Sequence, residues 1–267
     1  MKLMISCSQC MAETFEKNDL SEINNLRQSN VELNDNGFYE VTCDKGHTFV
    51  AVLQQMKFEI LFDFGVMAII DGYSREAVSN FASSLERFFE FSIEVFIYEN
   101  GVKQKDFAKV WNYCKNHSER QLGAFYFLFL STLKVEPKPM KRKWVEFRNK
   151  VVHQGYIANS KEALEYGNYV FKYINETLDL LQDNCKEAID KVIIENLATL
   201  NKEMKVKGLP VTTMCLPTII SLSAQERSRD FKQSVEDMKK NRLFQYTNND
   251  TQSTFIKHID EELGKVK

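Results

Sequence analysis

The 267-residue sequence predicts a mainly helical protein with a small β-containing module at its N-terminus. Glycine and proline, which interrupt helices, are scarce, with 10 and 4 copies. From about residue 56 onward, apolar residues recur every three to four positions, the spacing that places them on one face of a helix. Residues 1–55 follow a different pattern and carry three of the six cysteines. These observations separate a small N-terminal module from a longer helical region.

The N-terminal module, residues 1–55, contains two stretches typical of β-strands. Residues 38–42 (FYEVT) and 48–53 (TFVAVL) are short runs rich in β-branched and aromatic side chains. Residues 24–37 are polar and rich in asparagine, a composition that indicates a connecting loop. We therefore expect a hairpin of two strands preceded by a long polar connection.

The central region, residues 56–185, has the periodicity of a helical bundle. Asp71-Gly72 and Asn100-Gly101 are typical helix ends, and Ser160 is a good N-cap for the last helix. The segment 134–139 (KVEPKP) breaks the helical pattern. The predicted helices span residues 56–72, 74–101, 105–116, 119–133, a segment containing 144–153, and 160–184.

Residues 186–267 predict a helical C-terminal extension. The helical pattern continues to about Lys205, and residues 206–222 interrupt it with two prolines and a β-branched run. Two amphipathic or charged helices are expected to follow. The extension fits a dimerisation arm, a segment that binds a partner, or a lid.

Composition excludes some classes of protein. The formal net charge is −2, so a surface that binds nucleic acid must be local. No signal peptide is evident, and the longest apolar region, residues 58–70, is too short and too charged to cross a bilayer. We therefore expect a cytoplasmic protein with no membrane partner, whose cysteines are reduced thiols or metal ligands.

The clearest chemical motif in the module is a set of four potential metal ligands. Cys7 and Cys10 form a Cys-x-x-Cys pair, and Cys43 and His47 form a Cys-x-x-x-His pair. Two short-spaced pairs of thiolate and imidazole ligands suit tetrahedral zinc, and Gly46 suits the sharp turn before His47. We expect one structural zinc ion per chain in a zinc ribbon, and no catalytic metal. The alternative is three scattered buried thiols and an unrelated histidine.

The remaining cysteines have no metal-like neighbours in the sequence. Cys114, Cys185 and Cys215 are therefore expected to be buried, small apolar residues.

A second motif lies in residues 144–156 (WVEFRNKVVHQGY). Arg148 and His153 are five residues apart and would not share a face of a straight helix, unless the helix loosens or ends near Val152. Arginine offers a planar fork for phosphate oxygens, and histidine can exchange protons near neutral pH. Asn149 could orient either group. Together these are the parts for cutting RNA without a metal ion.

Cations surround this motif. Six of them fall within thirteen residues: Lys138, Lys141, Arg142, Lys143, Arg148 and Lys150. Such a cluster can attract a phosphate backbone, and we take Lys141, Arg142, Lys143 and Lys150 as candidate RNA-binding residues. The alternatives are a solvated helix face for the basic run and a helix C-cap for His153. Trp144 and Phe147 fit a helix core better than base stacking.

The stretch from Arg148 to His153 resembles the signature of the HEPN superfamily, an arginine followed by asparagine, aspartate or histidine and then by histidine four to six residues after the arginine. Residues 72–91 resemble the family's opening helix, and residues 160–174 resemble the helix after the motif. The resemblance covers roughly residues 57–184. It implies a bundle of four or five helices, usually a homodimer with the two motifs facing each other.

Many members of this family are metal-independent endoribonucleases, a class of hydrolase, in toxin–antitoxin and antiviral systems. The resemblance implies that Arg148 binds and polarises the scissile phosphate, that His153 is the acid or base, and that Asn149 orients them. The implied partners are RNA, a second copy of the chain, and an antitoxin or regulatory protein. The alternative is a non-catalytic HEPN module that binds RNA, a nucleotide or a partner protein.

Overall fold

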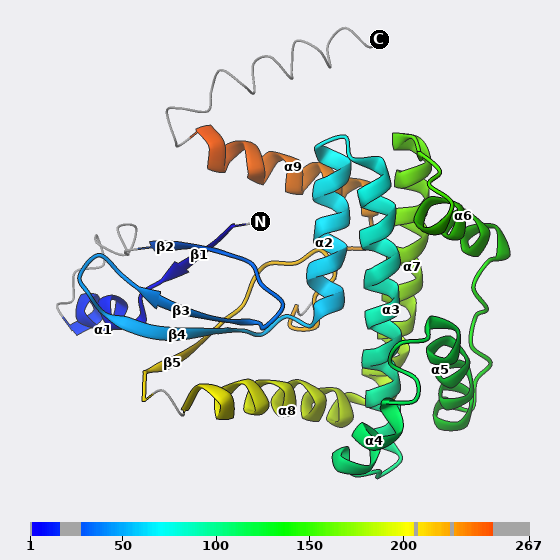
Figure 1. The fold of residues 1–267 in the computed structure, drawn as a ribbon, viewed down its shortest axis with the longest axis horizontal. Coiled ribbons are helices and arrows are strands. Elements are labelled where there is room, and N and C mark those ends of the chain that lie inside the picture. The colour runs from blue at the N-terminus through cyan, green and yellow to red at the C-terminus, as the bar shows by residue number, and fades with distance from the viewer. Residues whose placement is uncertain (1, 17–27, 206–207, 225–226, 248–267) are drawn as a thin grey trace, which may run out of the picture. The chain divides into compact units, whose positions relative to one another are not determined.

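The computed structural model describes residues 2–16, 28–205, 208–224 and 227–247. Over these residues the protein is mainly helical with a small N-terminal strand module, as the sequence predicts (Figure 1). The helices are α1 (Ser8–Glu16), α2 (Lys57–Ile70), α3 (Ser74–Glu99), α4 (Gln104–Trp111), α5 (Ser118–Leu133), α6 (Arg142–His153), α7 (Ser160–Asn184), α8 (Lys186–Lys205) and α9 (Phe231–Thr247). The strands are β1 (Lys2–Ser6), β2 (Gln28–Glu32), β3 (Phe38–Thr42), β4 (Thr48–Leu53) and β5 (Val211–Met214). In the described part of the chain, no helix is both long and apolar enough to cross a membrane.

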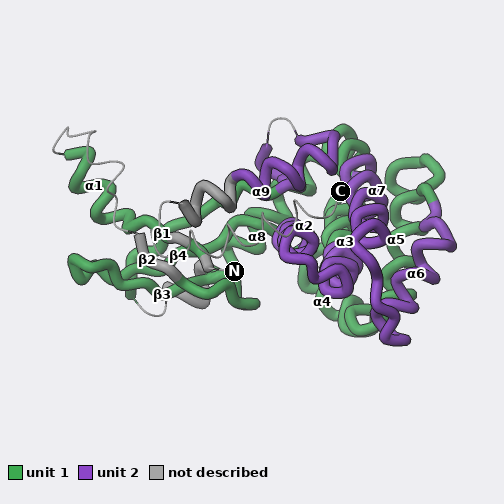
Figure 2. The backbone as a smooth tube through the Cα atoms, turned by 90° about the horizontal axis from the view of Figure 1, so that it is seen from above, with its two compact units in different colours: residues 1–57, 86–138, 178–218 green, residues 58–85, 139–177, 219–267 purple. Residues whose placement is uncertain are grey.

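The chain forms two compact units, and each combines segments that are distant in sequence (Figure 2). Unit 1 contains residues 1–57, 86–138 and 178–218, and unit 2 contains residues 58–85, 139–177 and 219–267. Helices α3 and α7 each contribute one part to each unit. The sequence analysis divided the chain into three consecutive segments, with boundaries at residues 55 and 185. These boundaries stay a prediction.

The strands of unit 1 form two small sheets. The predicted hairpin is confirmed: β3 and β4 are antiparallel, with Phe38 opposite Val52. Strand β5 adds to β4 in parallel, with Val50 opposite Val211, so the prolines of the predicted break at 206–222 flank a strand. Strands β1 and β2 pair antiparallel, with Lys2 opposite Glu32. Residues 24–37 were thus wrongly predicted as a loop throughout, because backbone pairing with β1 allows a polar stretch to form β2.

The central strand of this module is its most buried element. Val50 and Val52 of β4 are fully buried, and helix α8 covers them. The partly buried side chains packed against the two valines are Phe38, Leu197, Leu200, Leu209 and Val211. The module therefore obtains its core partly from the C-terminal extension, which a segment of 55 residues could not supply alone.

Aromatic side chains fill the helical part of unit 1. Phe89 and Phe96 of α3 pack on Phe125 of α5, with ring centroids 4.8 and 6.2 Å apart. Phe129, one turn further along α5, lies 5.9 Å from Phe96. These contacts pack an aromatic face of α3 against α5.

A second aromatic cluster lies at the centre of unit 2. Phe62 of α2 lies 5.0 Å from Phe81 of α3, and Phe171 of α7 and Phe231 of α9 complete the cluster. Gly65 faces Phe81, where an added Cβ atom would lie 2.4 Å from the ring. This position requires glycine because a methyl group would overlap the aromatic ring.

Helix α7 begins at Ser160, and its N-cap is the preceding residue, Asn159. The Oδ1 atom of Asn159 accepts the backbone N–H of Glu162 at 2.9 Å, and the Glu162 carboxylate accepts the backbone N–H of Asn159. This reciprocal pair is a capping box, so the prediction of Ser160 as the N-cap was wrong by one position. Helix α9 provides one of the two helices expected after residue 222, and the other lies outside the described residues.

Candidate functional site

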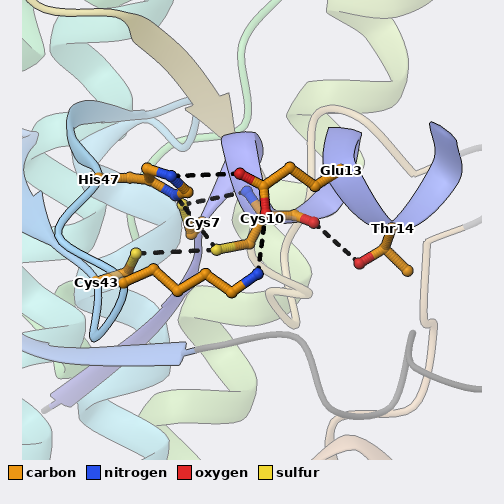
Figure 3. Close-up of polar contacts among 7 residues, drawn as sticks. Cys7, Cys10, Glu13, Thr14, Cys43 and His47 are labelled. Atoms are coloured by element: carbon orange, nitrogen blue, oxygen red, sulfur yellow. Dashed lines mark hydrogen bonds and ion pairs between the residues drawn. The ribbon is translucent and has the colours of Figure 1, made fainter. Parts of the chain in front are cut away.

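The four predicted metal ligands lie together in unit 1 (Figure 3). Cys7 follows strand β1, Cys10 lies in helix α1, and Cys43 and His47 flank the turn between β3 and β4. Their ligand atoms all lie within 4.8 Å of one another. The group could hold a metal ion, and the alternative of scattered, unrelated thiols is wrong.

Three of the distances within this cluster are close to those around one tetrahedral ion. The Sγ atoms of Cys10 and Cys43 are 3.8 Å apart. The Nδ1 atom of His47 lies 3.4 Å from the Cys10 sulfur and 3.7 Å from the Cys7 sulfur. Tetrahedral zinc, with bonds of about 2.3 Å to sulfur and about 2.0 Å to nitrogen, gives edges of about 3.8 Å between sulfurs and about 3.5 Å from sulfur to nitrogen.

Backbone hydrogen bonds shape both halves of the cluster. The Cys10 N–H donates to the Cys7 sulfur at 3.4 Å, and the Cys43 N–H donates to the carbonyl of His47 at 3.0 Å. Gly46 adopts a φ angle of +84° in the turn, and its N–H donates to the carbonyl of Cys43. As predicted, glycine suits this turn, because the left-handed conformation is costly for residues with a Cβ atom.

The pKa values of Cys10 and Cys43 are shifted in opposite directions. Burial, and then the neighbouring Cys7 and Cys43 thiols, raise the pKa of Cys10 to about 12. Burial also opposes ionisation of Cys43, but hydrogen bonds from the backbone N–H groups of His47 and Lys45 lower its pKa overall. The cluster therefore resists collecting several negative charges unless a cation binds there.

The other three cysteines have different surroundings. Cys185 is buried as predicted, and burial followed by the charge of Glu99 raises its pKa to about 11. Cys114 is half-buried, and Cys215 is exposed, so the prediction of a buried residue was wrong for Cys215. Its sulfur accepts the side-chain N–H of Gln55 at 2.9 Å. The side chain of Gln55 also exchanges two hydrogen bonds with the backbone of Leu216.

The three residues of the second motif lie together at the end of helix α6 in unit 2. An Nη1 atom of Arg148 lies 3.2 Å from Nε2 of His153 and donates to Oδ1 of Asn149 at 2.9 Å. His153 is exposed, and the other two are half-buried. A guanidinium can only donate hydrogen bonds, so this contact requires a neutral imidazole with a lone pair on Nε2.

The geometry of the helix end explains this contact. Helix α6 continues through His153, and the long stem of Arg148 carries its guanidinium around the helix to the imidazole. Gly155 follows with a φ angle of +71°, and the N–H of Tyr156 caps the carbonyl of Lys150 at 3.1 Å. The left-handed glycine ends the helix and turns the chain directly after the motif.

The candidate RNA-binding residues Lys141, Arg142, Lys143 and Lys150 are exposed on or beside helix α6. Arg142 and Asn149 are seven residues apart, and His153 follows four later, so these three lie on one helix face. Lys143 and Lys150 have the same seven-residue spacing and lie beside that face. The Glu146 carboxylate accepts a 2.7 Å hydrogen bond from Arg142 and offsets part of the positive charge.

The opposite face of α6 packs through aromatic rings. Trp144 and Phe147 each lie 5.7 Å from the ring of Tyr166, which is buried in helix α7. Trp144 also stacks on Tyr169, whose hydroxyl accepts the backbone N–H of Lys141 at 3.0 Å. These contacts hold α6 against α7 and leave the polar side chains of the motif outside.

Some polar residues beside these sites were missed by the sequence analysis. Glu13 contacts both His47 and Lys45, and its position three residues after Cys10 could have indicated a place on the same helix face. Glu59 and Asp63 are only 2% and 6% exposed. They accept the backbone N–H groups of Leu222 and Ile219, which fixes the segment before α9 to helix α2.

Comparisons with protein-family models, curated proteins and solved structures find no match to this chain. The function is therefore argued from the geometry of its own residues.

Proposed function

We propose that this protein is a metal-independent endoribonuclease of the HEPN type, acting in antiviral defence or as a toxin. The observation that carries the proposal is the contact between Arg148 and His153, with Asn149 on the same guanidinium. The contact brings together a phosphate-binding cation and a proton acceptor at a solvent-exposed helix end.

The chemistry is an attack of the RNA 2′-hydroxyl on the adjacent phosphorus. As the Arg148 guanidinium moves from Nε2 of His153 to the phosphate, that nitrogen takes the hydroxyl proton, the 2′ oxygen forms a bond to phosphorus, and the bond from phosphorus to the 5′ oxygen breaks. Arg148 stabilises the negative charge on the phosphorane, and Asn149 holds the guanidinium in place. The departing 5′ oxygen takes a proton from water or from the imidazole of a second copy. The products are a 2′,3′-cyclic phosphate and a 5′-hydroxyl.

The exposed basic side chains of α6 support binding of RNA beside the motif. Lys141, Arg142, Lys143 and Lys150 provide positive charge on an otherwise slightly acidic chain. Binding through these residues would be electrostatic and would weaken as salt increases, because phosphate contacts release counterions.

A homodimer would complete the site. The motif is exposed at the end of one helix, so two copies facing each other would exclude water and supply both an acid and a base. In a toxin or defence protein, an antitoxin or regulatory protein would control access to this site.

We assign the metal ion of unit 1 as one structural zinc per chain, in a zinc-ribbon-like site. Three cysteines and one histidine would occupy all four tetrahedral positions, so no coordination position would be left for a substrate. The ion would hold the β1–α1 segment to the hairpin of β3 and β4, and the cleavage would need no further metal.

The test is RNA cleavage by the zinc-loaded protein without added divalent ions. We expect Arg148→Ala and His153→Ala to lose about a hundredfold or more in rate. His117→Ala is the matched control, because His117 is also exposed but lies outside the motif. Equal rates for His153→Ala and His117→Ala would reject the catalytic role of His153.

The same experiment addresses the non-catalytic alternative. If the wild-type dimer binds RNA in a salt-dependent manner yet releases no product, with or without candidate partner proteins, then the motif is only a phosphate anchor. His153→Ala would then leave RNA affinity nearly unchanged.

A further inference from the structure

The imidazole of His47 contacts polar groups through both of its nitrogens (Figure 3). Its Nδ1 atom faces the sulfurs of Cys7 and Cys10. Its Nε2 atom lies on the other side of the ring, 3.3 Å from Oε1 of Glu13. The second oxygen of that carboxylate accepts a 2.9 Å hydrogen bond from the ammonium of Lys45. The cluster of ligands thus continues outward as a chain of three side chains.

We propose that Glu13 is a positioning residue for the metal site, holding His47 as an Nδ1 ligand, and that Lys45 in turn orients Glu13. This inference rests on the proposed metal site. A carboxylate that accepts the outer N–H of a ligating histidine fixes the tautomer, orients the ring and makes the ligating nitrogen a stronger donor. Glu13 lies where such a group must lie if Nδ1 binds the ion.

The positions of the residues in the sequence explain why this chain can form. Glu13 is three residues after Cys10 in helix α1, so both side chains project from the same face of that helix. Lys45 lies in the turn between Cys43 and His47. The outer contacts therefore join the same two segments that the four ligands join, and they reinforce the approach of α1 to the hairpin.

Exposure distinguishes this role from that of an ordinary surface ion pair. The side chains of Glu13 and Lys45 are 41% and 42% exposed, whereas that of His47 is 26% exposed. An ion pair as exposed as Glu13–Lys45 contributes little by itself. We therefore expect a large effect of removing Glu13 on zinc binding to act through its contact with His47, and removing Lys45 should have only a small effect.

The test is a zinc competition titration of the full-length protein against a chromophoric chelator. We expect Glu13→Ala to weaken zinc binding about ten- to a hundredfold. Glu13→Gln should lose less, because its amide oxygen can still accept the N–H of His47. Lys45→Met should change affinity by no more than about threefold, in line with an exposed pair. Glu16→Ala, which removes an exposed carboxylate from the same helix, is the matched control and should bind zinc like the wild type.

Two further readouts keep the result interpretable if a variant is unstable. Cobalt substituted for zinc should give the absorption of a tetrahedral site with three thiolates in every variant, which shows that the ligand set is intact. Nitrogen NMR of the zinc-loaded wild type should identify Nδ1 of His47 as the ligand and a proton on Nε2.

Three results would overturn the proposal. Equal zinc affinity of Glu13→Ala and Glu16→Ala would remove the role of Glu13, while the metal site itself would stand. Coordination of zinc through Nε2 would show that Glu13 cannot act as described. A wild-type protein that binds no zinc would reject the metal site and this inference together.

Discussion

The two candidate sites of this protein are built in opposite ways. The metal cluster joins residues about 40 positions apart, buries its three cysteines and places four ligand atoms around one point. The motif of Arg148 and His153 spans six residues of one helix, and it combines an exposed histidine with a half-buried arginine. Four converging ligands determine which metal ion can bind. An exposed motif instead gains substrate specificity from the surfaces that surround the bound molecule. The metal cluster is therefore best tested by measuring metal content and protein stability, and the motif by measuring RNA cleavage.

The largest expected effect is on the closed site. Cys43→Ser should reduce the metal content from about one zinc per chain to nearly none, because tetrahedral zinc binding requires the full ligand set. The free energy of unfolding of the module should fall with it, since metal binding is coupled to folding. Elemental analysis and thermal unfolding measure both. Cys215→Ser, at an exposed cysteine outside the cluster, should change neither.

The next effect concerns Asp63, a buried carboxyl group in unit 2, the unit that carries the motif. Burial raises the pKa of Asp63 to about 7, with the Ile219 N–H opposing and the charge of Glu59 adding to the rise. The folded protein therefore holds this proton more tightly than the unfolded chain, whose aspartate titrates near pH 4. The contribution of Asp63 to the free energy of unfolding should fall as pH rises from about 4 to about 7, by on the order of 4 kcal/mol.

Asp63→Asn isolates this contribution. The asparagine oxygen can still accept the N–H of Ile219 but cannot ionise, so the variant should gain stability over the wild type as pH rises through this window. Chemical denaturation of both proteins between pH 5 and 8 gives the difference, and effects of pH on the metal site cancel between them. A difference that does not change with pH would show that Asp63 keeps an ordinary pKa.

A smaller effect tests whether the open site needs the geometry of Arg148 as well as its charge. Arg148→Lys keeps the positive charge but loses the planar fork that contacts both His153 and Asn149. We expect RNA affinity to change little and the rate of cleavage to fall by about a hundredfold, roughly 2.7 kcal/mol in activation free energy. Single-turnover kinetics separate the two. A parallel loss of affinity and rate would make Arg148 a simple phosphate anchor.

The smallest effect concerns the charge beside the motif. Glu146→Gln removes the carboxylate that pairs with the 92%-exposed Arg142. The freed cation should tighten RNA binding by only a few fold, because exposed ion pairs are weak. Binding curves at several salt concentrations measure this gain. Glu165→Gln, an exposed residue of helix α7, is the control. An unchanged affinity would place the RNA path away from Arg142.

The sequence predicted features that depend on local patterns. The strands 38–42 and 48–53 were predicted with their observed bounds, because β-branched runs flanked by turn residues are unambiguous. Spacing alone identified Cys7, Cys10, Cys43 and His47. Features that depend on distant contacts were not predictable. The pairing of β5 with β4 joins residues about 160 apart, and the sequence of residues 211–214 does not indicate which strand they pair with.

Charged residues show the same limit. Glu59 and Asp63 looked like interruptions of an apolar stretch, yet both are buried and hydrogen-bonded to a segment some 160 residues away. Glu13 is an ordinary acidic residue in sequence and becomes notable only beside His47. For Arg148 and His153, helix periodicity alone argued against contact, because it ignores the reach of the arginine stem.

The most direct test of the central claim is the chemistry of the RNA ends. The zinc-loaded protein, with no other divalent ion, should cut RNA to give 2′,3′-cyclic phosphate and 5′-hydroxyl termini, which mass spectrometry identifies. A strand of the same sequence with a 2′-deoxy sugar at the cleavage position should resist cutting there, because it lacks the nucleophile. Products with 5′-phosphate ends, or cutting of the 2′-deoxy strand at the same position, would contradict the account.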